Sequence, residues 1–520
     1  MIKKKDLYKA VRAVGLVAAI AALSLFTPNT DNRLQAADLP AKYDPRPEGT
    51  SQIRNQYWGT CWAQSGISSF ESYFIHSGQT DNSIQLSVED VLWHSREGWN
   101  LRRRSDGGYA AMTTGYIMTQ GARLEKDIPY FGEPSDPADP INDFYGEGEN
   151  LEPVNYNKAP YVYEATDIIF AHSLTRDEVK SLIYEYGQLT TTYADGDGNV
   201  GRAPYFNEET GAYYMPEGLS SGANHAISII GWDDNYSKTN FNNMNQPAND
   251  GAWLIKNSYG TDFGQDGFIW ISYEDAWLLK MEEGDTLSFN YTIAAARAKT
   301  DRKAYLTDQF GATSKYAAEG GTSATFANIY DFGADEKISE LEITTWSKGS
   351  DYELYYAPVN GDSVNADSST WKLLSEGTIA YNGYMTVKSQ WDSAVPKGKG
   401  AIVLTIKGDN PTIATDESLL ENSQPLFNAI KDEKSAWILK NGAFEELEVA
   451  RSTDTGFEYT EKPDLCIRAY TLPVEKEENT PSTGDAMMKA VIISLGALMV
   501  GGFGLIVSIN KKKALNQPNK

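Results

Sequence analysis

Four polar residues, each inside its own distinctive run, follow one another along this chain and constrain its fold more than any other feature. Gln56 and Cys61 lie in Ile-Arg-Asn-Gln-Tyr-Trp-Gly-Thr-Cys-Trp-Ala (53–63). His225 lies in Asn-His-Ala-Ile-Ser-Ile-Ile-Gly-Trp (224–232), and Asn257 in Trp-Leu-Ile-Lys-Asn-Ser-Tyr-Gly (253–260). A thiol, an imidazole and an orienting amide together describe an acyl-transfer site built on a cysteine. We therefore expect a fold that brings these residues together.

The segment after Cys61 predicts a helix. Four apolar residues recur there at helical spacing: Ala63, Ile67, Phe70 and Phe74. Gly78 follows them as the expected C-cap. Cys61 is then at a helix N-terminus, where the macrodipole favours a thiolate. His225 opens an apolar, strand-like run and is the expected cationic partner, which lowers a cysteine pKa from its free value of roughly 8.5. The other histidines, His76, His94 and His172, are interpreted as structural.

The three runs, in this order and followed by Gly267-Phe-Ile, closely resemble the sequence blocks of the papain family of cysteine peptidases. The resemblance implies an α+β fold, with a two-lobed papain-like domain made of a helical lobe and a β-barrel-like lobe. It implies that Cys61 is the nucleophile, His225 the general acid and base, and Asn257 the group that orients His225. Gln56 would donate its side-chain amide to the oxyanion. Protein or peptide substrates are expected, with no cofactor and no metal ion.

The chain departs from the family pattern at several positions. Gln56 lies five residues before Cys61, where the family has six, so the loop is one residue short. Trp58 replaces the cysteine of a family disulfide, and Tyr259 replaces the tryptophan that covers the Asn-His hydrogen bond. His225 and Asn257 also follow Cys61 at more than the roughly 130 to 150 residues typical of papain. We expect surface insertions to account for the surplus, notably 233–250.

Four small residues resemble the family's substrate-binding positions. Gly107 and Gly108 resemble the Gly-Gly segment of the non-primed cleft, where a missing side chain lets an extended peptide approach the backbone. The alternative is an ordinary Gly-Gly turn. Ala110 and Ala226 would flank the pocket for the second residue before the scissile bond, which predicts a roomy apolar subsite.

Both ends of the chain carry features that predict export. A basic start, an apolar stretch and Ala36-Ala37 predict a signal peptide over 1–37. The other end has Thr-Pro-Ser-Thr-Gly (480–484), an apolar span and Lys511-Lys-Lys513, with a spacer and sorting motif over 473–484 and an anchor and tail over 485–520. This order resembles the sorting signal of Gram-positive surface proteins, which implies a sortase acting between Thr483 and Gly484. A plain membrane anchor is the alternative.

Composition narrows the classes of partner. A formal charge of -25 argues against nucleic acid and suits an exported protein. With only two cysteines, the chain has no disulfide scaffold, and Cys466 is predicted to be a buried thiol. The run Asp-Gly-Asp-Gly-Asn (195–199) has Val200 where a calcium loop of the EF-hand type needs glycine, so it is predicted to be a turn.

The length between the two terminal signals is too great for one core. We expect the papain-like domain over 38–280, a linker over 281–303 and an all-β sandwich over 304–472. Short alternating segments such as 340–344, 401–406 and 437–439 predict the sandwich. It resembles the lectin-like domain that follows the peptidase in some bacterial surface proteins. The resemblance raises cell-surface carbohydrate as a partner; a stalk or a shield beside the active site is the alternative role.

Three functions agree with the sequence. The first is a secreted, wall-attached cysteine endopeptidase that works through an acyl-enzyme. The second is a cell-wall peptidoglycan amidase, since such enzymes also use cysteine and then histidine. The third is a non-catalytic adhesin with a degenerate peptidase fold, an alternative motivated by the shortened loop between Gln56 and Cys61.

Overall fold

A computed structural model describes residues 39–98, 106–130, 158–196, 201–220, 222–281, 285–417, 419–421, 424–427, 436–449, 457–459 and 462–474. The predicted signal peptide, the sorting motif and the anchor with its tail lie outside these residues. Within the described ranges, no helix combines the length and the apolar character needed to cross a membrane.

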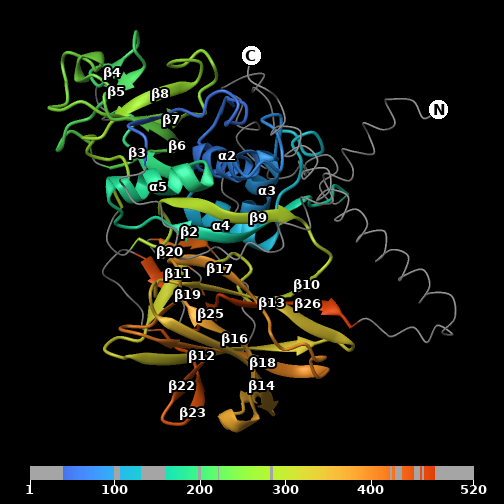
Figure 1. Cartoon of the computed structure of the whole chain (residues 1–520). Helices are drawn as coiled ribbons and strands as arrows, with labels where there is room; N and C mark the ends of the chain where they lie inside the picture. The colour runs from blue at the N-terminus through green and yellow to red at the C-terminus, as the bar shows by residue number, and fades with distance from the viewer. Residues whose placement is uncertain are drawn as a thin grey trace, which may run out of the picture. The chain divides into compact units, whose positions relative to one another are not determined.

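The α-helices of the described residues all belong to the first part of the chain (Figure 1): α2 (Cys61–His76), α3 (Val88–Gly98), α4 (Ala110–Thr119) and α5 (Arg176–Tyr186). The helix predicted after Cys61 is confirmed as α2, and its four apolar residues are fully buried. Gly78 follows with a φ of 69°, a conformation that glycine adopts at no steric cost and that ends the helix.

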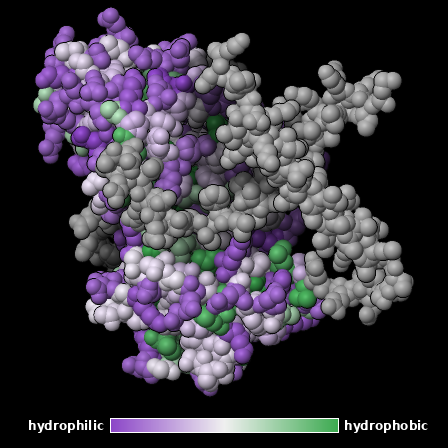
Figure 2. Space-filling model, in the orientation of Figure 1, coloured by the Kyte–Doolittle hydropathy of each residue, from purple (hydrophilic) through white to green (hydrophobic). Residues whose placement is uncertain are grey.

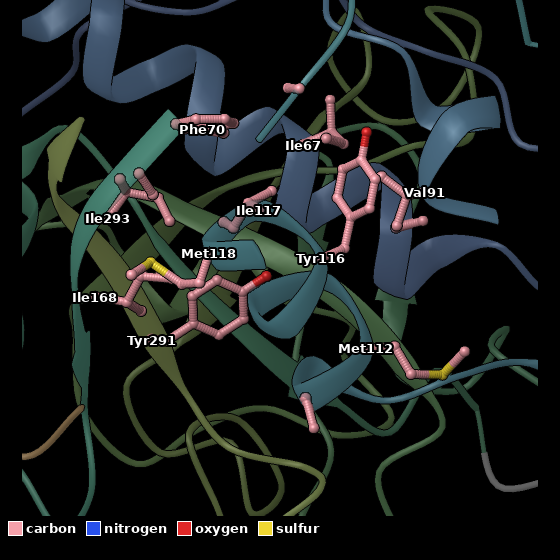
Figure 3. Packing of buried hydrophobic residues seen from close by; sticks show 14 of the residues in the cluster. Ile67, Phe70, Val91, Met112, Tyr116, Ile117, Met118, Ile168, Tyr291 and Ile293 are labelled. Atoms are coloured by element: carbon pink, nitrogen blue, oxygen red, sulfur yellow. The ribbon is translucent and has the colours of Figure 1, made fainter. Parts of the chain in front are cut away.

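A shared hydrophobic core positions α2 (Figure 3). Ile67 and Phe70 of α2 lie in one cluster with Tyr116 of α4 and with Ile168 and Ile293 from two strands. All five side chains are essentially excluded from water. Burying an aliphatic or aromatic side chain of this size contributes about 1.5 to 3 kcal/mol. The helix that begins at Cys61 is thus held in place by packing against both another helix and a sheet.

The strands of the first part all belong to one large sheet, which continues into strands of the second part. Their bounds are β1 (Lys42–Tyr43), β2 (Tyr163–Phe170), β3 (Leu189–Tyr193), β4 (Phe206–Asn207), β5 (Ala212–Tyr213), β6 (His225–Asp233), β7 (Ala252–Lys256), β8 (Phe268–Ser272) and β9 (Tyr291–Ala298). They are ordered β2-β9-β3-β6-β7-β8-β5-β4, with β1 paired to β6. The antiparallel register of β6 and β7 sets Ser228 opposite Lys256, so the start of β6 lies beside the residues that follow β7.

The second part of the described chain is all β, apart from a short 3-10 turn. Its strands are β10 (Lys303–Tyr305), β11 (Ser314–Ala317), β12 (Ser323–Phe332), β13 (Glu336–Thr345), β14 (Asp351–Asn360), β15 (Ser363–Val364), β16 (Lys372–Thr378), β17 (Gly383–Lys388), β18 (Gly398–Lys407), β19 (Thr412–Asp416), β20 (Leu419–Glu421), β21 (Gln424–Phe427), β22 (Ala436–Lys440), β23 (Ala443–Glu446), β24 (Phe457–Tyr459), β25 (Asp464–Leu465) and β26 (Ile467–Pro473). The predicted strands at 340–344, 401–406 and 437–439 fall within β13, β18 and β22.

Two sheets build the sandwich core. Among the described residues, one sheet of seven strands includes the path β15-β14-β18-β12-β22-β23. The other sheet is the large one that also holds β2 and β9, and β13 belongs to it. Ile343 of β13 packs in the same buried cluster as Leu354 of β14 and Leu404 of β18. Alternating inward-facing residues from both sheets are what a β-sandwich requires.

The linker predicted over 281–303 needs correction, because it contains β9. This strand pairs with β2 along most of its length and touches β3. In turn β2 pairs with β17, where Gly383 lies opposite Ile169 and Tyr384 opposite Ile168. The alanine-rich run of β9 lacks the alternation of apolar and polar residues that marks a half-buried strand, and the first three residues of the strand, 291–293, are all buried.

The surface shown in Figure 2 is mainly hydrophilic, and its hydrophobic residues form small, separate groups. Large exposed apolar side chains in the described residues are scattered along the sequence: Tyr57, Tyr184, Leu219, Met244 and Leu472. Isolated residues of this kind are normal on a protein surface.

Candidate active site

Cys61 is the first residue of α2 and is partly exposed. The helix places the thiol beside its unpaired N-terminal N–H groups, at the positive end of its dipole. Thr60 closes the first turn, because its carbonyl accepts hydrogen bonds from the N–H groups of Ala63 and Gln64. The prediction that Cys61 lies at a helix N-terminus is therefore confirmed, and its role as nucleophile stays a prediction.

His225 begins β6, and Asn257 follows β7. The side-chain Oδ1 of Asn257 accepts a hydrogen bond from the backbone N–H of Ser258 at 2.7 Å. Because a backbone N–H can only donate, this contact fixes which end of the amide is oxygen. The same Oδ1 lies 2.8 Å from Nε2 of His225, so Nε2 must be the donor. The other ring nitrogen, Nδ1, is left for the thiol of Cys61.

The pKa values of the two groups move toward an ion pair. Burial disfavours the Cys61 thiolate, but the hydrogen bond and the charge of His225 outweigh it and lower the pKa of Cys61. Burial also opposes a charged His225, yet the contacts with Cys61 and Asn257 raise the pKa of His225 above its usual value. Opposite shifts of neighbouring groups favour thiolate and imidazolium together.

Tyr259 covers this pair. Its ring stacks on the His225 imidazole, with centroids 4.5 Å apart and planes at 15°. Its hydroxyl donates to Oδ2 of Asp195 at 2.9 Å. A tyrosine thus occupies the place where the family pattern has tryptophan, and it lies over the ring that donates to Asn257.

Gln56 is tied into its own short loop. Its Oε1 accepts from the Ser258 hydroxyl at 2.6 Å, and its Nε2 donates to the Trp58 carbonyl at 2.9 Å. The backbone N–H of Gln56 also donates to the Ser258 carbonyl at 2.8 Å. An amide nitrogen carries two N–H donors, so one remains for another acceptor. The loop that is one residue short is therefore anchored to the segment that carries Asn257.

Three of the four predicted substrate-binding residues lie against Trp62 or the hydrophobic cluster that holds it. Gly108 rests against the Trp62 indole: a Cβ there would lie 2.4 Å from the ring. Gly107 has a φ of 72° and open space where a side chain would be. Ala226 belongs to the hydrophobic cluster that holds Trp62, and Ala110, the first residue of α4, packs against it. Their role toward a substrate stays a prediction.

No pattern in the sequence indicates two residues that hydrogen-bond to the predicted site residues or to Tyr259. In the sequence Ser258 is only one member of the run 253–260, yet in the structure it contacts both Gln56 and Asn257. Asp195 was predicted to belong to a turn, and its link to Tyr259 spans 64 positions. A carboxylate next to several glycines gives no local sign of such a partner.

The remaining histidines and the second cysteine lie elsewhere. His94 is half-buried, with its ring centroid 5.4 Å from that of Tyr116, and loss of solvation lowers its pKa to about 4. Nδ1 of His172 lies 3.3 Å from the Met281 sulfur. Cys466 is buried and forms no disulfide, as predicted.

Comparisons with known proteins agree with this geometry. The chain matches the papain family cysteine protease model over residues 39–286 and the lectin like domain model over residues 304–471. It is 25% identical to cathepsin J of Mus musculus over 47% of this chain and 64% of that protein. It is 22% identical to human cathepsin L2 over 45% of this chain and 61% of that protein. The chain thus spans less than two thirds of these relatives.

Solved structures give a more complete match. The cysteine protease and lectin-like domains of Cwp84, a surface layer associated protein of Clostridium difficile, are 30% identical, with a TM-score of 0.69. That match covers 84% of this chain and 89% of the other. A second structure of Cwp84, after propeptide cleavage, is 31% identical, with a TM-score of 0.69, over 83% and 99% of the two chains. The chain belongs to the papain family of cysteine proteases, with a lectin-like domain after the protease domain.

Proposed function

We propose that this protein is a secreted, cell-wall-attached cysteine endopeptidase that hydrolyses peptide bonds of proteins. The observation that carries the proposal is the arrangement at the start of α2. Cys61 has a lowered pKa, and Asn257 holds His225 with Nε2 as donor. An activated thiol beside an oriented imidazole is the arrangement that acyl transfer needs.

The reaction proceeds in two halves. The Cys61 thiolate attacks the scissile carbonyl, and the oxyanion receives hydrogen bonds from the Cys61 backbone N–H and from the Gln56 amide. His225 gives its proton to the leaving amine, which departs and leaves a thioester on Cys61. His225 then takes a proton from water, and the resulting hydroxide equivalent releases the acid product and frees the thiol. Neither half needs a cofactor or a metal ion.

The substrate approaches over Gly107 and Gly108 in this proposal. The open space at Gly107 supports it, because an extended peptide needs close access to backbone donors and acceptors. Ala110 and Ala226 flank a roomy apolar subsite. The lectin-like domain match suggests a carbohydrate of the cell surface as a further partner.

Location rests on the two ends of the sequence and on one relative. The signal at 1–37 and the run at 480–484 support export followed by sortase cleavage between Thr483 and Gly484. The description of Cwp84 as surface layer associated supports an extracellular place of action. Anchoring to the wall or membrane of a Gram-positive bacterium is the corresponding proposal.

The test uses purified protein and a diverse peptide library. Cleavage that disappears in Cys61→Ala, together with labelling of Cys61 by an epoxysuccinyl thiol inhibitor, is the expected result. Release of muropeptides from purified wall, without peptide cleavage, would instead support the amidase. A folded wild-type protein that takes up no inhibitor would support the adhesin.

A further inference from the structure

The hydroxyl of Tyr259 needs a hydrogen-bond partner in a fixed position. The ring lies flat against His225, so it can keep water from the hydrogen bond between His225 and Asn257. A tryptophan at this place would cover the bond by size alone, whereas a tyrosine is smaller and has a polar end that seeks a partner. The orientation of the Tyr259 ring therefore depends on where its hydroxyl is held.

Asp195 holds that hydroxyl. Its Oδ2 accepts the hydrogen bond from Tyr259 at 2.9 Å, and the carboxylate is only 8% exposed. Arg202 donates to the same carboxylate through two nitrogens, with Nε 2.5 Å from Oδ1 and the second hydrogen bond from Nη2 to Oδ2. Paired, fork-like contacts of this kind fix the geometry of a carboxylate more strictly than a single bond.

The Arg202 guanidinium also covers the tyrosine. Its centre lies 5.1 Å from the Tyr259 ring centroid and 4.7 Å from that of Phe263. The Phe263 ring in turn meets Tyr259 edge-on, with centroids 5.2 Å apart. We call Asp195, Arg202 and Tyr259 the tyrosine anchor.

The tyrosine anchor is tied to the strand that carries the imidazole. The backbone N–H of Asp195 donates to the side-chain oxygen of Asn224 at 2.8 Å, and Asn224 directly precedes His225. The next backbone N–H, that of Gly196, donates to the Tyr213 hydroxyl at 3.1 Å. The carboxylate is therefore held in a fixed position relative to His225.

The charges of the anchor favour its role. Burial opposes ionisation of Asp195, but Arg202 outweighs it and keeps the pKa of Asp195 below its usual value. Burial, followed by the charge of Asp195, raises the pKa of Tyr259, so its hydroxyl stays a donor. The negative Asp195 also acts on the imidazole in the direction that raises the pKa of His225.

We infer that Asp195, gripped by Arg202, is a positioning residue that fixes the Tyr259 ring over the hydrogen bond between His225 and Asn257. The inference rests on the proposed peptidase function. It adds to that function two residues, Asp195 and Arg202, that lie outside the three runs resembling the papain family. Asp195 touches no reacting atom. It acts through Tyr259, and through its charge on the imidazolium.

Other groups also face His225 and bear on any pH dependence. The titratable and charged groups in question are Cys61 from α2, Tyr193 from β3, Tyr259 after β7, and Asp195 with Arg202. Burial raises the pKa of Tyr193 well above its usual value, so it stays neutral. Burial also lowers the pKa of Lys256, which precedes Asn257, to about 7, and its ammonium donates to the hydroxyls of Ser51 and Ser68. Because Asp195→Asn removes none of these contacts, a shift of the alkaline limb in that variant is assigned to His225 and its charged neighbours.

The experiment compares kcat, KM and the pH profile of peptide hydrolysis in Asp195→Asn, Tyr259→Phe and Asp44→Asn. Asp44 is the matched control, since Arg46 donates to its carboxylate through Nε and Nη2 outside the site. In Asp195→Asn, kcat should fall about 10-fold with little change in KM, because the ring loses its hold. The alkaline limb should move down by about half a pH unit, since an anion that favours imidazolium is gone.

Tyr259→Phe separates anchoring from charge, and it changes a single oxygen atom. It should lower kcat about 3 to 10-fold while leaving the alkaline limb in place, because Asp195 keeps its charge. If Asp195→Asn does not fold, this variant decides the matter. Wild-type kinetics in Asp195→Asn, or a change in KM alone, would overturn the inference, as would a Tyr259→Phe protein with unchanged kcat. A wild-type protein without Cys61-dependent cleavage would instead refute the proposed function.

Discussion

The two free cysteines of this chain lie in opposite chemical environments. Cys61 is partly exposed at the start of α2, where His225 lowers its pKa against the effect of burial. Cys466 is 1% exposed, and burial raises its pKa well above the usual value, with the carboxylates of Asp308 and Asp416 adding to the effect. Neighbouring charge and access to water therefore decide which of the two thiols is favoured as the thiolate, the reactive form.

Substitution of the two cysteines should differ most in its effect on catalytic activity. Cys61→Ala should lower kcat/KM by about 10⁴-fold or more, because no other group can form the acyl-enzyme. Cys466→Ala should keep its activity and lose about 1 kcal/mol of stability through a smaller side chain in a packed core. Peptide hydrolysis and thermal unfolding of both variants measure this. Equal losses of activity in the two variants would erase the distinction.

The next effect concerns the buried charges near Cys466. Arg468 is fully buried and contacts Asp308 at 2.6 Å and Glu342 at 2.6 Å. Arg468→Met should lower the free energy of unfolding by about 3 to 5 kcal/mol, because two carboxylates lose their buried cation. Lys399→Met removes an exposed partner of Asp362 and should cost less than about 1 kcal/mol. Denaturant unfolding measures both, and similar costs would contradict the role given to Arg468.

A smaller effect is expected at the oxyanion. Gln56→Ala should lower kcat about 100 to 1,000-fold with little change in KM, because a donor to the transition state is lost. Gln85, whose amide donates to Gln52 at 2.6 Å, offers a control glutamine in a different pair. Steady-state kinetics of Gln56→Ala and Gln85→Ala decide the point. A loss confined to KM would mean that Gln56 binds substrate and does not serve the oxyanion.

Local patterns in the sequence predicted the two elements that carry Cys61 and His225. The spacing of apolar residues after Cys61 predicted α2, and the apolar run after His225 predicted β6, because each signal lies within one helix or one strand. The contacts of Ser258 with Gln56 and of Asp195 with Tyr259 could not be predicted, since residues far apart in the chain make them. These contacts form only when distant strands pair, and the sequence of a single segment does not reveal that pairing.

The boundary between the two domains was harder to predict than the elements inside them. β9 lies within the predicted linker, and its register with β2 is part of a sheet that continues to β17. Asp167 of β2 accepts a hydrogen bond from Tyr381 at 2.5 Å, and Thr386 of β17 donates its N–H to the same carboxylate. Buried polar contacts of this kind appear only once both strands are in place.

The most direct test of the central claim is the pH dependence of alkylation at both thiols, followed by mass spectrometry on the folded chain. We predict that Cys61 reacts with a midpoint below the ordinary cysteine pKa of about 8.5, and that this midpoint rises in His225→Ala. Cys466 should react only after denaturant unfolds the protein. A common alkaline midpoint for the two cysteines, or prior labelling of Cys466 in the folded state, would contradict the account.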